Sequence, residues 1–478
     1  MKKTKIVATI GPKTQNLTLI KKLIKAGVNV FRLNFSHGDH EYHKQSIKLI
    51  RRASAELKLP VGILQDLSGP KIRIGEVKKP FLVHAGEILE LHKTKILGEK
   101  TGDCFKVSVE YPEILEDLKE KDLIYVADGL IKLRVIKVLE DRVITEVLQG
   151  GVISSKKGLN FPGVSLSIPA FTPKDREDLL FGLQNEIDFV ALSFVNRKED
   201  VLACKEVIEK FGKGQPVFAK IETQTALENI EEILEVADGL MVARGDLGVE
   251  VPIERVPVIQ KVLVEKGRKL GKPVIIATQM LTSMIDSTMP TRADVSDIAN
   301  AVLDGADALM LSDETAIGNF PVECVKMMVK IIKEAEKLYP YLKETYQEVS
   351  SDFAIAYSSC VLASEVKAKA IVVFTKSGSS AMRIAKFRPK ELILANVHDE
   401  EILRRLTVVW GVYPCFVLSE VKTIDSMVKE FLVRAYQQRL INKKDTLVLT
   451  MGYPVGKVGS TNLIRLIKPD QIQALLES

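Results

Sequence analysis

Short apolar stretches alternate along the chain with longer segments in which apolar residues recur at helical spacing. The first stretch, residues 5–10, leads to Asn16, a residue type favoured just before the first turn of a helix. Helical spacing then continues to Gly27, a residue type that commonly ends helices. Another apolar stretch follows at once. A strand, a helix and a second strand in succession form the repeating unit of a parallel sheet.

Eight apolar stretches of this kind predict the core of the largest domain. They begin near Lys5, Val30, Gly62, Phe189, Val217, Gly239, Val274 and Ala308. Eight parallel strands, each followed by a helix, are typical of a closed (β/α)₈ or TIM barrel.

The interval between the third and fourth stretches has a different pattern. Residues 125–135 alternate apolar and polar positions around an Asp-Gly pair, which is typical of a β-hairpin. We therefore expect an all-β insertion over residues 71–168. Residues 1–70 and 169–345 remain for the barrel, and their combined length is close to the barrel norm of about 250 residues.

A third domain is predicted after a polar segment that ends near residue 352. Apolar stretches resume at 371–374, 392–394 and 446–449, again separated by segments with helical spacing. This alternation indicates a smaller α/β domain over residues 346–478. The predicted fold class is thus α/β, with a TIM barrel, an inserted β domain and a C-terminal α/β domain.

Composition narrows the classes of function. The 478 residues are 46% hydrophobic and 27% charged, and 68 Lys and Arg against 62 Asp and Glu give a net charge of +6. The basic residues form only short groups, whereas a general nucleic-acid binder usually has a dense basic patch. No apolar run approaches the roughly 18 residues of a membrane span, and no signal-peptide core follows the first lysines. We expect a cytoplasmic protein with neither a nucleic-acid nor a membrane partner.

Cysteine usage argues against two structural devices. The five cysteines are an odd number, widely spread and without a Cys-x-x-Cys pair. This pattern disfavours a disulfide framework and a structural zinc site, so we expect all five thiols to be reduced.

Polar residues collect where the predicted barrel strands end, which is the active face of barrel enzymes. The second stretch ends with Arg32, Asn34 and Ser36, which share one face because side chains alternate along a strand. Lys220 and Glu222 share a face at the end of the fifth stretch. The third, sixth and seventh stretches end with Asp66, Lys71, Arg73, Arg244, Asp246 and Thr278. Each residue alone has an ordinary structural explanation, but their joint position predicts an active site.

These residue types favour a narrow range of chemistry. Glu222 and Asp246 supply two carboxylates, the hard ligands by which Mg²⁺ is usually held. Arg32, Arg73 and Lys220 would surround that metal with fixed positive charge, which suits a phosphorylated acid as substrate. The Walker motif for nucleotide binding does not occur. The residues alone leave both phosphoryl transfer and carbon–carbon lysis open.

Five segments, in order and in spacing, resemble pyruvate kinases. They are residues 32–38, 69–73, 220–222, 241–248 and 277–281. The resemblance covers nearly the whole chain, and it implies a barrel with an inserted β-barrel lid domain and a C-terminal α/β regulatory domain. It also implies Mg²⁺-dependent transfer of the phosphoryl group of phosphoenolpyruvate to ADP, giving pyruvate and ATP in glycolysis, with Mn²⁺ as an alternative metal.

The resemblance assigns a role to each matching residue. The implied catalytic residues are Lys220, Arg32, Arg73 and Thr278, and the implied metal ligands are Glu222 and Asp246. Substrate contacts are implied for Arg32, Lys220, Gly245, Asp246 and Thr278. Nucleotide contacts are implied for Asn34, His37, Arg73 and Lys174. The inserted domain would close as a lid and exclude water from the reacting phosphoryl group.

One position departs from many relatives in an informative way. Potassium-dependent relatives hold the ion with residues that match Asn34, Ser36 and Asp66 and with a threonine that is Leu67 here. They carry glutamate where this chain has Lys71. An ammonium group at Lys71 would supply the charge of the ion, so we predict that K⁺ is dispensable. A second departure is Ile317, where many relatives have a lysine.

The C-terminal domain contains a loop of small residues between a strand and a helix. It consists of Thr375, Ser377, Gly378, Ser379 and Ser380 around Lys376, with Arg383 and Lys386 on the following helix. Backbone amides in such a loop bind phosphate. The loop resembles the family's effector site, so we expect a phosphorylated allosteric effector, and the family implies a homotetramer. A metal-dependent phosphoenolpyruvate or pyruvate barrel lyase remains the alternative function, followed by a non-catalytic phosphometabolite sensor.

Overall fold

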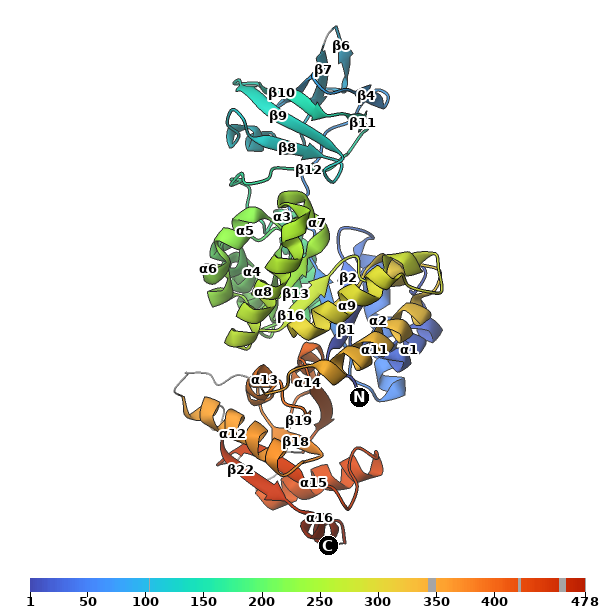
Figure 1. Ribbon diagram of the computed structural model, residues 1–478, viewed down its shortest axis with the longest axis vertical. Helices are drawn as coiled ribbons and strands as arrows, with labels where there is room; N and C mark the ends of the chain where they lie inside the picture. Colours follow the sequence, from blue (N-terminus) through green and yellow to red (C-terminus); the bar gives the residue numbers. More distant parts are fainter. Residues whose placement is uncertain (103, 343–349, 420–422, 455–460, 478) are drawn as a thin grey trace.

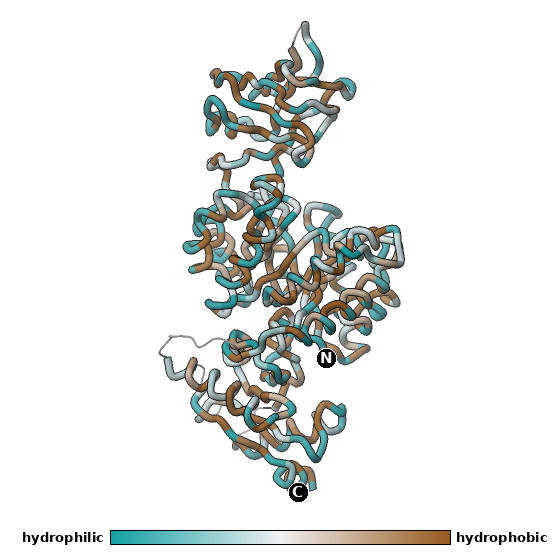
Figure 2. The backbone as a smooth tube through the Cα atoms, in the orientation of Figure 1, coloured by the Kyte–Doolittle hydropathy of each residue, from teal (hydrophilic) through white to brown (hydrophobic). Residues whose placement is uncertain are grey.

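Three units lie one above another along the longest axis of the molecule (Figure 1). The computed structural model describes residues 1–102, 104–342, 350–419, 423–454 and 461–477. A barrel occupies the middle, an all-β unit lies above it, and an α/β unit that includes the C-terminus lies below. Hydrophobic stretches of backbone run through all three units (Figure 2). Among the described residues, buried apolar side chains form one cluster in the β unit, one in the barrel, one shared by the barrel strands and the C-terminal unit, and one within the C-terminal unit.

The barrel is closed by eight parallel strands in the order β1-β17-β16-β15-β14-β13-β3-β2. They are β1 (Lys5–Thr9), β2 (Val30–Asn34), β3 (Gly62–Asp66), β13 (Phe189–Leu192), β14 (Val217–Ile221), β15 (Gly239–Ala243), β16 (Val274–Ala277) and β17 (Ala308–Leu311). Each strand begins where the apolar pattern places it. The predicted TIM barrel is therefore confirmed.

Helices surround the barrel strands. They are α1 (Leu17–Ala26), α2 (His40–Leu57), α3 (Pro173–Gln184), α4 (Lys198–Phe211), α5 (Gln224–Glu228), α6 (Ile230–Val236), α7 (Arg244–Glu250), α8 (Val256–Leu270), α9 (Arg292–Asp304), α10 (Asp313–Ala316) and α11 (Pro321–Ala335). The predicted caps of the first helix are both present. The Asn16 side chain accepts a hydrogen bond from the Leu19 amide, and Gly27 ends the helix with φ of 129°.

The all-β unit is inserted between β3 and β13. Its strands are β4 (Phe81–Val83), β5 (Ile88–His92), β6 (Glu99–Thr101), β7 (Cys104–Ser108), β8 (Leu123–Val126), β9 (Ile131–Val138), β10 (Arg142–Gln149), β11 (Gly151–Ile153) and β12 (Leu159–Asn160). They form a seven-stranded sheet and a two-stranded sheet. The antiparallel pairing of β8 with β9 confirms the predicted hairpin.

The C-terminal unit is a five-stranded sheet flanked by helices. Its elements are α12 (Ser351–Glu365), β18 (Ala370–Phe374), α13 (Ser379–Lys386), β19 (Leu392–Val397), α14 (Glu400–Arg405), β20 (Val412–Val417), α15 (Ile424–Gln437), β21 (Leu447–Gly452), β22 (Thr461–Ile467) and α16 (Pro469–Glu477). The sequence pattern located β18, β19 and β21 but not β20 or the antiparallel edge strand β22. Both missed strands have many half-exposed residues, so their apolar signal is weak.

Some sequence expectations concern the chain as a whole. The predicted boundary between residues 345 and 346 lies within 343–349, outside the described residues. All five cysteines are free thiols. Throughout the described ranges, the helices are too short or too polar to cross a lipid bilayer.

Buried ion pairs join the amino-terminal ends of the barrel strands to the C-terminal unit. Asp307, which precedes β17, lies 3.0 Å from Arg388, and both side chains are 4% exposed. Asp188, which precedes β13, lies 2.8 Å from Arg404 of α14. The Lys5 ammonium, on β1, donates to the Val412 carbonyl of β20. We call these residues the amino-end cluster.

Candidate active site

Lys220 stands at the centre of a buried charge cluster at the carboxyl ends of the barrel strands. Its Nζ lies 3.1 Å from Glu222 Oε1 and 3.2 Å from Asp66 Oδ1. It also donates a hydrogen bond to Ser193 Oγ at 2.6 Å. Arg32, on β2, places its Nε 2.6 Å from Asp66 Oδ2. We call these five residues the carboxyl-end cluster; it unites four residues that the sequence singled out from three different strand ends.

Electrostatics fix the charge states within this cluster. Burial favours a neutral Lys220 amine, but the carboxylates of Asp66 and Glu222 outweigh burial and raise its pKa. Burial likewise opposes ionisation of Asp66, but Lys220 and Arg32 together hold its pKa below the usual value. Lys220 is therefore a permanent cation near neutral pH, and it is suited to stabilise negative charge rather than to accept a proton.

Glu222 and Asp246 form the pair of carboxylates that the sequence predicts as metal ligands. Glu222 is 1% exposed and accepts a hydrogen bond from the Phe194 amide at 2.7 Å. Burial, reinforced by Asp246, raises the pKa of Glu222 to about 7, although Lys220 opposes the shift. In the described part of the chain, no hydrogen bond or ion pair engages the Asp246 carboxylate, which faces a cavity. Carboxylate oxygens have more than one lone pair, so Glu222 can still bind a cation beside Asp246, and such a pair fits Mg²⁺, whose remaining ligands are usually water and substrate oxygens.

A denser metal site is absent from the described residues, where no group of three or more His, Cys, Asp or Glu side chains is placed to hold a metal ion. The donor set is thus oxygen-only and small. Such a set suits Mg²⁺ or Mn²⁺ better than zinc.

Thr278 lies directly after β16 in a strained backbone conformation. Its φ is 70° and that of Gln279 is 57°, values that are rare for residues with a side chain. The Gly245 amide donates to Thr278 Oγ1 at 2.9 Å, and Arg244 Nη2 donates to the Thr278 carbonyl at 2.7 Å. Residues at the start of α7 therefore hold Thr278 in place. The Gly245 amide, predicted to receive the substrate carboxylate, is bonded to the Thr278 hydroxyl in this structure.

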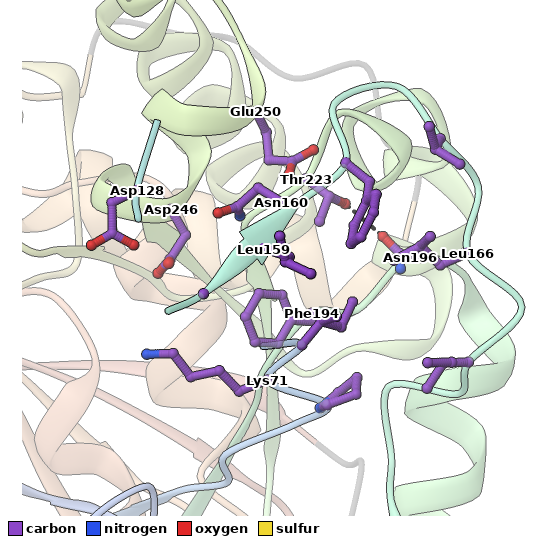
Figure 3. Close-up of a pocket in the computed structure, with 16 residues that line it drawn as sticks. Lys71, Asp128, Leu159, Asn160, Leu166, Phe194, Asn196, Thr223, Asp246 and Glu250 are labelled. Carbon is purple, nitrogen blue, oxygen red and sulfur yellow. Dashed lines mark hydrogen bonds between the residues drawn. The ribbon is translucent and has the colours of Figure 1, made fainter. Parts of the chain in front are cut away.

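A cavity of about 60 Å³ lies between the all-β unit and the top of the barrel. The charged side chains lining it are Lys71, Asp128, Asp246 and Glu250. Figure 3 shows Asp128 and Asp246 near each other, with the Lys71 ammonium directed to the same side. Leu67, by contrast, is fully buried in the barrel core, so its side chain offers nothing to an ion.

The predicted nucleotide residues fall into two places. Lys174 Nζ lies 3.3 Å from the Phe35 carbonyl, and the Ser36 amide donates to Asn34 Oδ1 at 3.2 Å, so Lys174 and the loop of residues 34–37 are neighbours. His37 belongs to this loop and is exposed. Arg73 lies apart, where its backbone bridges to Gly158 at the base of the all-β unit.

The predicted effector loop lies in the C-terminal unit between β18 and α13. The Gly378 amide donates to Thr375 Oγ1 at 3.1 Å, and the Ser377 and Ser379 hydroxyls are 3.0 Å apart. Gly378 has φ of 86°, which favours glycine. Ser380 is 6% exposed and already bonded to Thr461. The two predicted assisting residues are also engaged: Arg383 pairs with Asp352 at 2.9 Å, and Lys386 lies over the Phe353 ring.

The sequence-based prediction gave no role to three residues of this region, although it placed one of them, Arg244, at a strand end. Ser193 follows β13 in the same strand-end position that drew attention elsewhere, so a search for hydroxyl side chains at strand ends finds it. Arg244 lies in a segment that carries the family resemblance, but its contact with Thr278 depends on the approach of two strands. Glu250 gives no signal in the sequence, because its surroundings outside α7 come from two segments that are distant in the sequence.

Known proteins match this architecture and sequence. A sequence model of the pyruvate kinase barrel domain matches residues 1–325, and one of the pyruvate kinase alpha/beta domain matches residues 353–467. Pyruvate kinase 2 of Synechocystis is 46% identical over 474 residues, covering 97% of this chain and 79% of the relative. Pyruvate kinase of Thermotoga maritima is 44% identical over 474 residues, covering 98% and 100%.

The solved structures agree with the sequence comparisons. The crystal structure of a pyruvate kinase from Cryptosporidium parvum superposes with a TM-score of 0.92 at 35% identity and covers 98% of this chain and 96% of that one. The family models together span most of the sequence, and the relatives align nearly end to end. The chain belongs to the pyruvate kinase family of phosphotransferases.

Proposed function

We propose that this chain transfers the phosphoryl group of phosphoenolpyruvate to ADP with the help of Mg²⁺, as the glycolytic pyruvate kinase reaction requires. The observation that carries the proposal is the permanently charged Lys220 within 3.2 Å of two carboxylates, beside Asp246, whose carboxylate has no partner among the described residues. Glu222 and Asp246 would hold Mg²⁺, which when bound would supply positive charge to the oxygens of an anionic substrate. The protein side chains perform the remaining tasks.

Lys220 and Arg32 stabilise the charge that moves during the reaction. Lys220 cannot act as a base near neutral pH, because its pKa is raised, so it donates hydrogen bonds to oxygens of the phosphoryl group and of the developing enolate. Asp66 holds the Arg32 guanidinium in position. Thr278 is held by Gly245 and Arg244, and it directs a proton, through water, to the enolate methylene carbon.

The decisive test is ATP formation from phosphoenolpyruvate and ADP with Mg²⁺. We expect one ATP for each pyruvate released, and neither product in Lys220→Gln. Pyruvate released without ATP, or lysis of a carbon–carbon bond, would favour the lyase instead. Folded wild-type protein that makes no ATP with Mg²⁺ or Mn²⁺ would refute the proposal.

Independence from potassium is part of the same proposal. Lys71 directs its ammonium toward the side of the cavity that Asp246 occupies, and Leu67 replaces a hydroxyl with a buried apolar side chain. We expect equal turnover in K⁺-free buffer and in buffer with added K⁺. In Lys71→Glu, which removes the cation and restores a carboxylate, activity should fall and become responsive to K⁺. Wild-type activity that appears only with K⁺ would contradict this role.

Regulation by a phosphorylated metabolite is proposed for the loop of residues 375–380. The hydroxyls of Ser377 and Ser379 lie on the surface next to the glycine at the start of α13. Ser377→Ala should weaken activation by sugar phosphates or AMP and leave basal turnover unchanged. Ser380→Ala is a poorer test, because Ser380 is buried against Thr461. Unchanged activation in Ser377→Ala would count against the site.

The proposal also includes assembly into a homotetramer. The domain boundaries at residues 70/71, 168/169 and 345/346 belong to the same proposal. Several apolar side chains of the barrel are exposed, among them Ile253 at 69% and Val258 at 62%, near the start of α8, and Met289 at 66%, before α9. Light scattering coupled to size-exclusion chromatography should give four chains for each particle. A Val258→Glu variant should lower that number, and a wild-type monomer would refute the assignment.

A further inference from the structure

Glu250 is a buried carboxylate that the proposed chemistry does not use. It is the last residue of α7, and it is 8% exposed. The first turn of the same helix carries Gly245 and Asp246. One short helix therefore has the proposed metal and substrate residues at its start and a buried acid at its end.

Polar groups of two separate segments approach the Glu250 carboxylate. They are the side chain of Asn160 with the backbone amide of Phe161, and the backbone amide of Gln224, and each favours the ionised form and lowers the pKa of Glu250. Asn160 belongs to β12, the last strand of the lid before the chain returns to the barrel, and Gln224 begins α5 of the barrel. Figure 3 shows Glu250 and Asn160 on the same wall of the cavity. Glu250 thus touches the lid and the barrel at once.

The lid segment that Glu250 contacts also positions Arg73. The Leu159 amide donates to the Ile72 carbonyl at 2.9 Å, and Gly158 bridges to Arg73. The outgoing and returning connections of the lid are therefore paired with each other. Because these two connections are paired, the position of Asn160 and Phe161 affects the position of Arg73.

We infer that Glu250 is a positioning residue that ties the lid hinge, residues 158–161, to α7 and so fixes Arg73 relative to Asp246. This role rests on the proposed phosphoryl transfer, in which Arg73 and Asp246 act on the same substrate. Each carboxylate oxygen accepts donors best when ionised, because charge-assisted hydrogen bonds are the stronger kind. The tie is therefore strongest when Glu250 carries its charge.

The surroundings make the ionisation of Glu250 sensitive to pH near neutrality. Burial raises its pKa to about 7, the three donors oppose that shift, and Asp246 reinforces it. The other charged groups lining the cavity are Lys71, from the outgoing connection, and Asp128, from the β8–β9 turn. Below pH 7 the carboxyl gains a proton, and the hinge loses part of its attachment.

The test uses Glu250→Gln in the full-length chain, with Glu254→Gln as the matched control. Glu254 is exposed and lies four residues further along, so the same chemical change there touches no hinge. We expect kcat/KM for phosphoenolpyruvate to fall about tenfold in Glu250→Gln, the loss of roughly one charge-assisted hydrogen bond, and to stay unchanged in Glu254→Gln. Glu250→Asp, which keeps the charge on a shorter side chain, should recover part of the loss.

Hydrogen exchange separates this role from a purely structural one. Amides of residues 158–161 should exchange faster in Glu250→Gln, and those of β14 should not change. The ratio of wild-type to variant kcat/KM should approach one below pH 6, where wild-type Glu250 is also neutral. A lower Tm with unchanged hinge exchange and unchanged kinetics would overturn the inference.

A second variant keeps the test decisive if Glu250→Gln does not fold. Asn160→Ala removes one donor from the lid side and should increase hinge exchange in the same segment. Hinge exchange equal to wild type in Asn160→Ala would overturn the inference. Hydrogen exchange is measured without substrate, so it tests the role of Glu250 at the hinge whether or not the protein makes ATP. Wild-type protein that makes no ATP would refute only the proposed reaction.

Discussion

Both ends of the barrel bury charged side chains, but the two ends differ in whether every carboxylate has a partner within the protein. In the amino-end cluster, Asp307 accepts the Val274 and Trp410 amides as well as Arg388. In the carboxyl-end cluster, side chains supply nearly all the partners, and Asp246 beside them has none within the described residues. Carboxylates that are fully partnered hold two units together, whereas a fixed cation beside a carboxylate without a partner among the described residues can bind ligand.

The largest effect on activity is expected from a substitution at Lys220. Lys220→Gln should lower kcat by at least about 10³-fold, because it removes the cation that stabilises moving charge. The fold should survive, since Arg32 still balances Asp66 and Glu222 can take up a proton. A coupled ATP assay and a thermal melt measure the two effects. Activity within tenfold of wild type would show that Lys220 is a structural partner only.

The second test removes charge from the amino-end cluster. Asp307→Asn leaves Arg388 buried without a counter-charge and should lower stability by about 3 kcal/mol, while kcat below the melting range stays within about twofold. Trp410, the single tryptophan, is buried and donates its amide to Asp307, so its fluorescence reports on this interface during urea unfolding. Glu206→Gln, in an exposed pair with Lys210, is the control and should leave stability unchanged. A large loss of kcat with unchanged stability would reverse the assignment of the two ends.

A third, smaller effect is expected at Arg244. Its guanidinium bonds the Thr278 carbonyl and pairs with Asp297 at 2.7 Å. Arg244→Lys keeps the charge but loses the forked geometry, so kcat should fall about tenfold. Arg255→Lys, the same chemical change at an exposed position, should have no effect. Equal kinetics in both variants would remove Arg244 from the positioning of Thr278.

The smallest effect concerns pH and the amino-end cluster. Burial lowers the pKa of Lys5 from 10.5 to about 8. Between these values the unfolded chain binds the extra proton, so this group makes the protein more stable as pH rises. The stability of Lys5→Met relative to wild type should therefore fall by about 1 kcal/mol between pH 7 and pH 9. A difference that stays constant with pH would show that Lys5 titrates normally in the folded protein.

The sequence predicts the barrel well because its strands are buried on both faces. Such strands read as continuous apolar runs, and β1, β14 and β17 are all of this kind. Strand β20 contains Pro414 and alternates buried with half-buried residues, and β22 lies at an edge, so neither produces such a run. Burial on both faces, rather than strand propensity alone, explains why the barrel strands could be predicted from the sequence and β20 and β22 could not.

The same distinction applies to the site. Lys220 and Glu222 could be placed together because alternation along one strand is a local rule. Their contact with Asp66 follows from the barrel, which brings strand ends together. The bond from Arg244 to the Thr278 carbonyl and the setting of Glu250 depend on backbone shape and on segments distant in the sequence. Such contacts leave no pattern along the chain.

The place of the lid insertion has a consequence for the synthesis of the chain. Strands β3 and β13 are hydrogen-bonded neighbours in the barrel, yet the whole lid is translated between them. The entropy of closing a chain grows only by about 0.6 kcal/mol for each doubling of its length, so the finished barrel tolerates the insertion easily. During translation, however, β3 emerges with one edge unpaired and must wait for its neighbour. The lid, which has its own hydrophobic core, can fold in that interval and bring the two edges together.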